Sequence, residues 1–166
     1  PGEEITRPTV DRVKEGMFSA VQFLLAGARV LDLFAGSGQL GIEALSRGAA
    51  RCVFIDSSRE ACAVVRQNLK AAGLFEKASV AETAAEMYLA ACRERFDLVL
   101  LDPPYRQGTV AALLPAVAAV TAPGGTVLAE TEHGAPLPER CGTLTLKKQY
   151  KYGTVALARY EADAEF

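Results

Sequence analysis

The sequence predicts an α/β fold in which a mostly parallel, seven-stranded sheet carries helices on both faces and ends in an antiparallel hairpin. Short apolar runs typical of strands alternate with segments of helical spacing, a pattern that indicates a parallel sheet covered on both sides. Half of the 166 residues are hydrophobic and 23% are charged, which is enough for one sizeable core. We therefore expect a single domain over residues 1–166, with a frayed tail at 161–166.

The first half of the chain contains three predicted helices and two predicted strands. Apolar residues recur at three- and four-residue steps after Thr9, which is a good helix N-cap, and continue to Leu25. Serine residues mark the start of one further helix, and glycine residues mark the ends of two. The remaining elements of this half are a strand at 29–34, a helix at 39–47 ended by Gly48, a strand at 51–56, and a helix from Ser57 or Ser58 to Gly73.

The second half continues this alternation and then changes character. Its predicted elements are a strand at 79–81, a helix at 83–92, a strand at 96–101, a helix at 109–120 and a strand at 126–130. Pro115 has no backbone N–H, so we expect it to kink or restart its helix. Residues 144–160 form two alternating runs around a tight connection at 151–153, which predicts the hairpin at the sheet edge.

A glycine loop follows the first predicted strand. The stretch LDLFAGSGQLG contains Gly36-x-Gly38-x-x-Gly41, the spacing by which dinucleotide-binding folds hold a ligand at a helix N-terminus. Asp56 ends the second strand, where a carboxylate can bind two ribose hydroxyls. Both NAD and S-adenosylmethionine carry such a ribose. A carboxylate at Asp32, just ahead of the loop, repels a pyrophosphate but not a sulfonium, and so favours S-adenosylmethionine.

A second motif follows the buried strand at 96–101. Asp102-Pro103-Pro104-Tyr105 places the Asp102 carboxylate and the carbonyls of Asp102 and Pro103 on a backbone that proline stiffens. This cluster of acceptors suits an exocyclic amino group of a nucleobase, whose nitrogen it can aim at a methyl carbon. Tyr105 is placed to stack on the base. The alternative interpretation is a proline-stiffened turn without chemistry.

Composition limits the other classes of function. The net charge of −2 argues against a general polyanion-binding protein, although residues 140–160 carry five basic residues and no acid. The four cysteines are widely spaced and there is one histidine, so we expect neither a metal site nor disulfides. No secretory or membrane-spanning segment is recognised, and we expect a cytoplasmic protein.

The pair FAGSG and DPPY, with an acid ending the second strand, resembles the Rossmann-like class I S-adenosylmethionine-dependent methyltransferases that act on amino groups of nucleic-acid bases. Within that class, TRPTVDRVKEGMF, LDLFAGSGQLGIEALSRGA and the closing YKYG resemble the RsmD family, the 16S ribosomal RNA guanine-N2 methyltransferases of bacteria. The resemblance covers nearly the whole chain.

The resemblance implies roles for individual residues. The methionine half of the cofactor is expected at Asp32, Phe34, Ala35, Gly36, Ser37 and Gly38, its ribose at Asp56 and Ser57, and its adenine near Thr83 and Ala84. Catalysis falls to Asp102, Pro103, Pro104 and Tyr105, and contacts with RNA phosphates to Arg7 and Arg12. Independently of the resemblance, Arg106 is a further phosphate candidate because it directly follows the DPPY motif, and Lys151 because it lies in the basic hairpin. For the hairpin residues, edge protection by charge and aromatic packing is the competing interpretation.

Two departures from the family pattern leave points open. Family members have a short basic segment before T-R-P-T, which we expect this chain to lack. After the third strand the class often has an acid or amide followed by alanine, whereas this chain has Glu82-Thr83-Ala84. The Thr83 side chain, a backbone N–H near Ala84, or Glu82 can face adenine N6. Alternatively, Glu82 is a solvated loop residue and Thr83 a helix cap.

The expected activity is methyl transfer to guanine N2 in 16S ribosomal RNA, within an assembling or assembled small ribosomal subunit. The target base must leave its stack to reach the pocket, and no metal is required. We expect a monomer that does not bind membranes. The competing hypotheses are a DNA adenine-N6 methyltransferase, which needs a target-recognition insert not seen here, an NAD oxidoreductase, and a non-catalytic RNA-binding assembly module.

Overall fold

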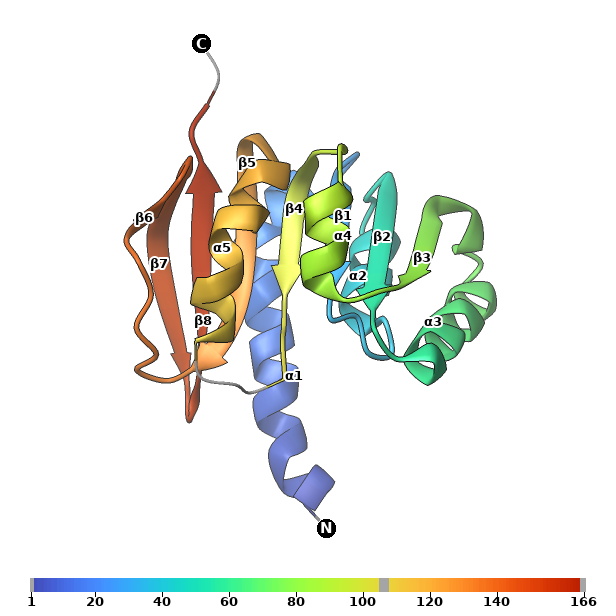
Figure 1. The fold of residues 1–166 in the computed structure, drawn as a ribbon. Coiled ribbons are helices and arrows are strands. Elements are labelled where there is room, and N and C mark those ends of the chain that lie inside the picture. Colours follow the sequence, from blue (N-terminus) through green and yellow to red (C-terminus); the bar gives the residue numbers. More distant parts are fainter. Residues whose placement is uncertain (1, 105–107, 165–166) are drawn as a thin grey trace.

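The computed structural model describes residues 2–104 and 108–164, with the backbone alone for residues 2–11 (Figure 1). Its helices are α1 (Gly2–Val21), α2 (Gln39–Ser46), α3 (Arg59–Ala72), α4 (Ala85–Ala91) and α5 (Thr109–Val120), with short 3-10 turns at Gln22–Leu24 and Phe75–Lys77. Its strands are β1 (Arg29–Leu33), β2 (Arg51–Asp56), β3 (Ala78–Glu82), β4 (Phe96–Leu101), β5 (Thr121–Glu132), β6 (Arg140–Cys141), β7 (Leu144–Tyr152) and β8 (Val155–Ala162).

The strands form one sheet in the order β3-β2-β1-β4-β5-β8-β7-β6. β1 to β5 run parallel, and β8, β7 and β6 continue the sheet with antiparallel pairs. The order reverses between β1 and β4, so the fold has the doubly wound, Rossmann-like topology that the alternation predicts. The ligand edge is therefore the one where the parallel strands end.

The strand count of seven was wrong, because β6 adds an eighth strand. β6 has only two residues and exists through its pairing with β7, so its own sequence carries no periodicity that predicts it. The helix start at Thr9 was also wrong, since α1 already begins at Gly2. β8 continues to Ala162, where it pairs with Leu144, so the chain is not frayed at 161–162.

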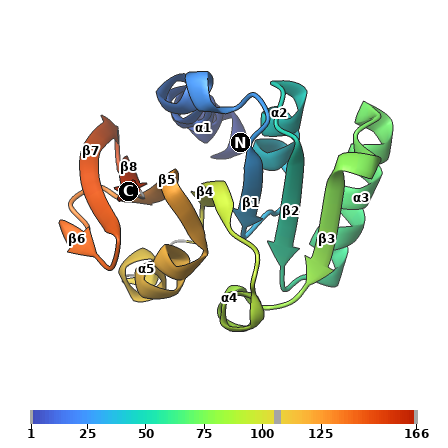
Figure 2. The same cartoon turned by 90° about the horizontal axis from the view of Figure 1, so that it is seen from above.

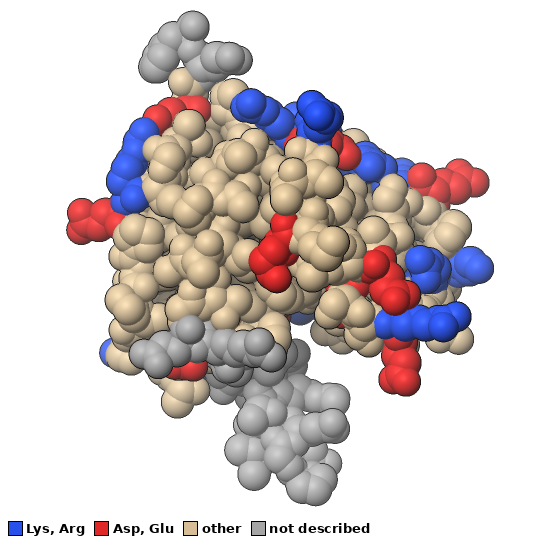
Figure 3. All heavy atoms as spheres, in the orientation of Figure 1, with Lys and Arg blue, Asp and Glu red and all other residues tan. Residues whose placement is uncertain are grey.

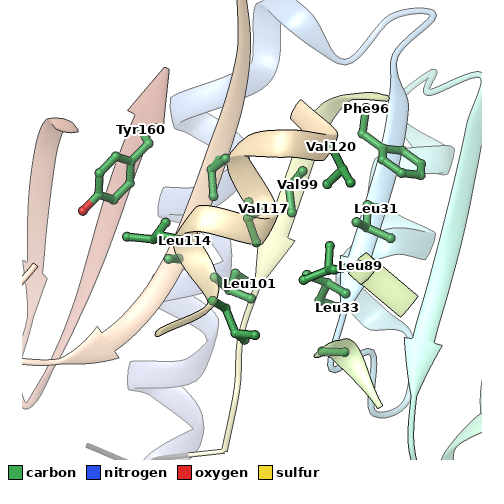
Figure 4. Packing of buried hydrophobic residues seen from close by; sticks show 14 of the residues in the cluster. Leu31, Leu33, Leu89, Phe96, Val99, Leu101, Leu114, Val117, Val120 and Tyr160 are labelled. Atoms are coloured by element: carbon green, nitrogen blue, oxygen red, sulfur yellow. The ribbon is translucent and has the colours of Figure 1, made fainter. Parts of the chain in front are cut away.

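The helices cover both faces of the sheet, as expected (Figure 2). α1, α2 and α3 pack one face through a cluster that includes Phe18, Leu45 and Leu69. α4 and α5 pack the other through Leu89, Leu114 and Val117, which belong to one cluster with residues of β1, β4, β5 and β8 (Figure 4). α5 is one continuous helix although it contains Pro115, so it does not restart there.

Local signals set several boundaries. The Ser58 hydroxyl accepts from the Ala61 amide at 3.1 Å and caps α3, which ends at Gly73 in the left-handed conformation, with φ 73°. The hairpin between β7 and β8 turns at Gly153, as predicted.

None of the helices within the described ranges is long and apolar enough to cross a membrane.

Candidate active site

Two neighbouring hollows lie where the parallel strands end, at the lower edge of the sheet in Figure 1. The α4-side cleft, of about 460 Å³, is lined by the ends of β1, β2 and β4 and by the start of α4. The α1-side cleft, of about 340 Å³, lies between α1, the loop after β1, and the ends of β4 and β5. Phe34, Gly36 and Asp102 line both, so the expected cofactor loop and the DPPY segment meet at one place.

The loop after β1 has an unusual backbone. Phe34 has φ 60°, a sparsely populated conformation for a non-glycine residue, and Gly36 and Gly38 have φ 60° and 82°. The Ala35 amide donates to the carbonyl of Ile55 at 2.9 Å, which ties the loop to β2. Nδ2 of Asn68, on α3, donates to the Ser37 carbonyl at 2.9 Å. Sequence reasoning missed Asn68, which lies far from the motif along the chain.

Asp32 lies under this loop and lines neither cleft. Its side chain is 1% exposed, and its Oδ2 accepts from the Gly41 amide at 3.0 Å, which joins β1 to the first turn of α2. Burial raises the pKa of Asp32 well above its ordinary value, the hydrogen bond from Gly41 opposes this, and the charges of Asp102 and Asp56 add to the rise. The structure thus places Asp32 as a support for the glycine loop.

Gly41 explains the close approach of α2 to the sheet. A Cβ atom at this position would lie 2.3 Å from the Phe54 ring and 2.7 Å from Cys52 Sγ. The third glycine of the motif therefore serves helix packing, whereas a Cβ at Gly36 would project into open space.

Asp56 faces the α4-side cleft from the end of β2. Its Oδ2 accepts from the Gly36 amide at 2.9 Å, and its Oδ1 accepts from the Ser58 amide at 2.8 Å. These bonds fix the carboxylate and leave each oxygen a further lone pair. A fixed carboxylate with two free acceptor positions suits a pair of vicinal hydroxyls, and Ser57 lines the cleft beside it.

The far wall of the α4-side cleft comes from the start of α4. Thr83, Ala84 and Glu86 line it, whereas Glu82 is exposed and does not. The N-cap of α4 is Ala84, which has no side-chain cap bond, so the expectation that Thr83 caps this helix was wrong. Glu86, which sequence reasoning missed, is the acid that α4 contributes to this cleft. Its position three residues after Thr83, in the first helical turn, was the available signal.

Asp102 lies at the junction of the two clefts, directly after β4. Burial raises its pKa to about 7, with further contributions from the charge of Glu130 and a side-chain hydrogen bond to it. Pro103 is buried and Pro104 is exposed. Tyr105 and Arg106 lie outside the described residues.

The basic residues expected to face RNA come from opposite ends of the chain. Arg12 of α1 lies over the Tyr152 ring, with 5.8 Å from its guanidinium carbon to the ring centroid. Lys151 precedes Tyr152 at the hairpin tip and is exposed, while the side chain of Arg7 lies outside the described part of the chain. Two other basic residues of the C-terminal segment are paired with acids, Arg140 with Asp163 at 2.5 Å and Arg159 with Glu161.

The face that carries α4 and α5 has a different character. Its coloured surface in Figure 3 is mostly tan, with acidic side chains near the middle and Lys and Arg near the periphery. This face therefore offers a polyanion little electrostatic attraction near its middle.

Comparison with known proteins connects these features to a family. A family model described as Conserved hypothetical protein 95 matches residues 1–161. YlbH of Bacillus subtilis (strain 168) is 40% identical over 161 residues, covering 94% of this chain and 88% of its own length. Ribosomal RNA small subunit methyltransferase D of Escherichia coli (strain K12) is 32% identical over 163 residues, covering 96% and 81%.

Solved structures agree with the sequence matches. The Escherichia coli protein yhhF superposes with a TM-score of 0.85 at 30% identity, over 93% of this chain and 86% of its own. The fold, the order of the motifs and these relatives confirm the resemblance found in the sequence. The chain belongs to the Conserved hypothetical protein 95 family, which is the RsmD family its motifs resemble.

Proposed function

We propose that this protein transfers a methyl group from S-adenosylmethionine to the exocyclic N2 amine of a guanine in 16S ribosomal RNA. The observation that carries the proposal is that Asp102 lies at the junction of two clefts, one built like a nucleoside site and one open toward α1. The relative in Escherichia coli, named for small-subunit ribosomal RNA methylation, supports the substrate class.

The residues around the clefts fit S-adenosylmethionine. Asp56, with Ser57 beside it, offers fixed acceptors for the ribose hydroxyls, and Thr83 and Ala84 border the space for adenine. Phe34, Ala35, Gly36 and Ser37 border the space for the methionine part, with Gly38 starting the helix and Asp32 supporting the loop. The bound cofactor supplies an electrophilic methyl group on a cationic sulfur. Asp56, Glu86 and Asp102, which line the clefts, favour that positive charge on the sulfur.

The DPPY segment positions the nucleophile. The carboxylate of Asp102 and the carbonyls of Asp102 and Pro103 accept hydrogen bonds from the amino group, and Pro104 and Tyr105 support the base. Localising the amino nitrogen in this way exposes its lone pair to the methyl group, so orientation contributes most of the rate. No covalent enzyme intermediate and no metal are needed.

RNA binding is assigned to Arg7, Arg12, Arg106 and Lys151. The base must be unpaired or flipped out before its amine enters the pocket, which favours an RNA loop within an assembling or assembled small subunit. We propose that the protein acts there as a monomer, in the cytoplasm.

Incubation of the protein and labelled S-adenosylmethionine with small ribosomal subunits from cells lacking the enzyme tests the proposal. Digestion and nucleoside mass analysis should yield N2-methylguanosine, and Asp102→Ala should abolish it while still binding the cofactor. Label in N6-methyladenine of DNA would indicate the alternative methyltransferase. Tight RNA binding by both the parent protein and Asp102→Ala, with no methylation by either, would indicate a non-catalytic assembly module.

A further inference from the structure

Lys14 is a cation in the wall of the α1-side cleft that none of the roles assigned above includes. It lies on α1 and lines this cleft together with Val13 and Met17 of the same helix. No other Lys or Arg among the described residues lines either of the two clefts. A ligand that fills the α1-side cleft therefore meets one positively charged side chain there, and it meets it on the α1 wall.

The ion pair between Lys14 and Glu43 of α2 is long. Nζ of Lys14 lies 3.7 Å from Oε1 of Glu43, whereas a charge-assisted hydrogen bond has a length of about 2.8 Å. Glu43 has a closer partner, because its Oε2 accepts from Nε of Arg47 at 2.9 Å. The side chains of Lys14 and Glu43 are 31% and 33% exposed, and ion pairs that are open to water contribute little to stability. Lys14 can therefore exchange Glu43 for another carboxylate at small cost.

The helix that carries Lys14 is held in place by the hairpin of β7 and β8. A Cβ atom at Gly16 would lie 2.7 Å from Cζ of Tyr152 and closer still to its hydroxyl group, so the end of the Tyr152 ring lies directly against the backbone of α1. Arg12, one helical turn before Gly16, lies over the same ring. These contacts fix α1 beside the cleft and so restrict the positions that Nζ of Lys14 can reach.

The acids of the same cleft decide which part of the cofactor faces Lys14. Asp102 and Glu130 line the cleft from the ends of β4 and β5. The methionine part of S-adenosylmethionine carries an ammonium group, a sulfonium and a carboxylate. Acidic side chains attract the two cationic groups and repel the carboxylate. The carboxylate of the cofactor is therefore favoured at the α1 wall, where Lys14 lies.

We propose that Lys14 binds the carboxylate of the methionine part of S-adenosylmethionine. This inference rests on the proposed methyl transfer and deepens it, because it assigns the end of the cofactor for which the glycine loop and Asp56 supply no cation. The Lys14 ammonium group donates charge-assisted hydrogen bonds to the carboxylate in place of its long contact with Glu43. With the ribose held at Asp56, a fixed carboxylate end restricts the direction in which the methyl group points.

Calorimetric titration with two ligands tests this assignment. One is S-adenosylhomocysteine, the cofactor without its methyl group, and the other is decarboxylated S-adenosylhomocysteine, which lacks only the carboxylate. The wild type should bind the first roughly 10-fold more tightly than the second. Lys14→Met keeps a long unbranched side chain on the cleft wall but removes the charge. It should weaken binding of S-adenosylhomocysteine roughly 10-fold and change the affinity for the decarboxylated ligand by about twofold at most.

Glu43→Gln separates ligand binding from a purely structural role of the ion pair. If Lys14 serves only to hold α1 against α2, Lys14→Met and Glu43→Gln should weaken the binding of both ligands alike. If Lys14 binds the carboxylate, Glu43→Gln removes the competing acid and should leave S-adenosylhomocysteine bound as tightly as before or more tightly. Lys14→Arg keeps the charge and should retain most of the affinity. Lys77→Met, at an exposed position outside both clefts, is the matched control and should bind like the wild type.

An unchanged affinity of Lys14→Met for S-adenosylhomocysteine, or an equal loss for both ligands, would overturn the inference and leave the methyltransferase proposal intact. If the wild type binds neither S-adenosylmethionine nor S-adenosylhomocysteine, the proposed function itself is contradicted. Lys14→Gln replaces Lys14→Met if that variant does not fold. Equal affinities of the wild type for the two ligands would also overturn the assignment, and this comparison needs no variant.

Discussion

Asp102 has a side chain whose environment opposes its ionisation. Burial, with the nearby charge of Glu130, raises the pKa of Asp102 to about 7 in the folded protein, whereas the pKa of an aspartate in an unfolded chain is about 4. Between these values the folded state binds more protons than the unfolded state, so a rise in pH through this window lowers the free energy of unfolding. The proposed chemistry and the stability of the fold therefore make opposite demands on this residue.

Asp102→Asn should consequently stabilise the protein at pH 8. The amide has no charge to desolvate and can donate to Glu130, so we expect a gain of about 1–3 kcal/mol at pH 8 and little change near pH 4. Urea denaturation at both values measures this difference. Glu139→Gln, at an exposed position, is the control and should show no pH-dependent gain in the free energy of unfolding. If Asp102→Asn instead lowers the free energy of unfolding at pH 8, the surroundings of Asp102 stabilise its carboxylate.

Gly41 makes a second residue-level prediction. A methyl group there meets the buried Phe54 ring at 2.3 Å, and the ring has little room to move. Gly41→Ala should lower the free energy of unfolding by about 1–3 kcal/mol through overpacking. In a Phe54→Leu background the same substitution should cost less, because the smaller side chain leaves space for the methyl group. An equal cost in both backgrounds would show that contact with the ring is not the cause.

At the scale of elements, the sequence predicts best those boundaries that local chemistry determines. α3 begins after Ser58 and ends at Gly73 because a hydroxyl cap and a left-handed glycine act within a few residues of the helix. β6 and the start of α1 have no comparable local signal. β6 depends on pairing with β7, and α1 extends seven residues before the Thr9 that local capping rules favour. For β6, strand pairing thus supplies what local propensity does not.

The same distinction applies to the candidate site. Gly36, Asp56 and Asp102 are recognisable because they belong to contiguous motifs or end predicted strands. Glu130 also ends a predicted strand, but its relation to Asp102 follows from β5 lying next to β4, which the strand order reveals. Asn68 holds the Ser37 carbonyl from 31 residues away, a contact that no local pattern encodes.

At the scale of the whole molecule, the N-terminal part of α1 and the tip of the β7–β8 hairpin extend toward the edge where the parallel strands end (Figure 1). Arg12 and Tyr152 join these two segments. Their cations therefore lie on the same side of the molecule as the clefts. If RNA binds there as we propose, it reaches Asp102 at the junction of the two clefts without crossing the α5 face.

Arg12→Ala and Lys151→Ala should each weaken RNA binding. If each cation neutralises one phosphate, its loss makes the plot of log RNA-binding constant against log salt concentration less steep, by about 0.7 for single-stranded RNA. Titration of an RNA loop at several salt concentrations measures the slope, and S-adenosylmethionine affinity should stay unchanged. Arg93→Ala, at an exposed position before β4, is the matched control. Equal salt slopes for all three variants would place the RNA surface elsewhere.

The order of the strands also governs how the sheet can be completed during synthesis. β8 lies between β5 and β7, although it is the last of the three to leave the ribosome. A nascent polypeptide that ends before residue 155 has no partner for the outer edge of β5, and β7 cannot dock on the sheet until β8 has formed. The last-made strand is thus the one that joins β7 to the part of the sheet that bears the two clefts.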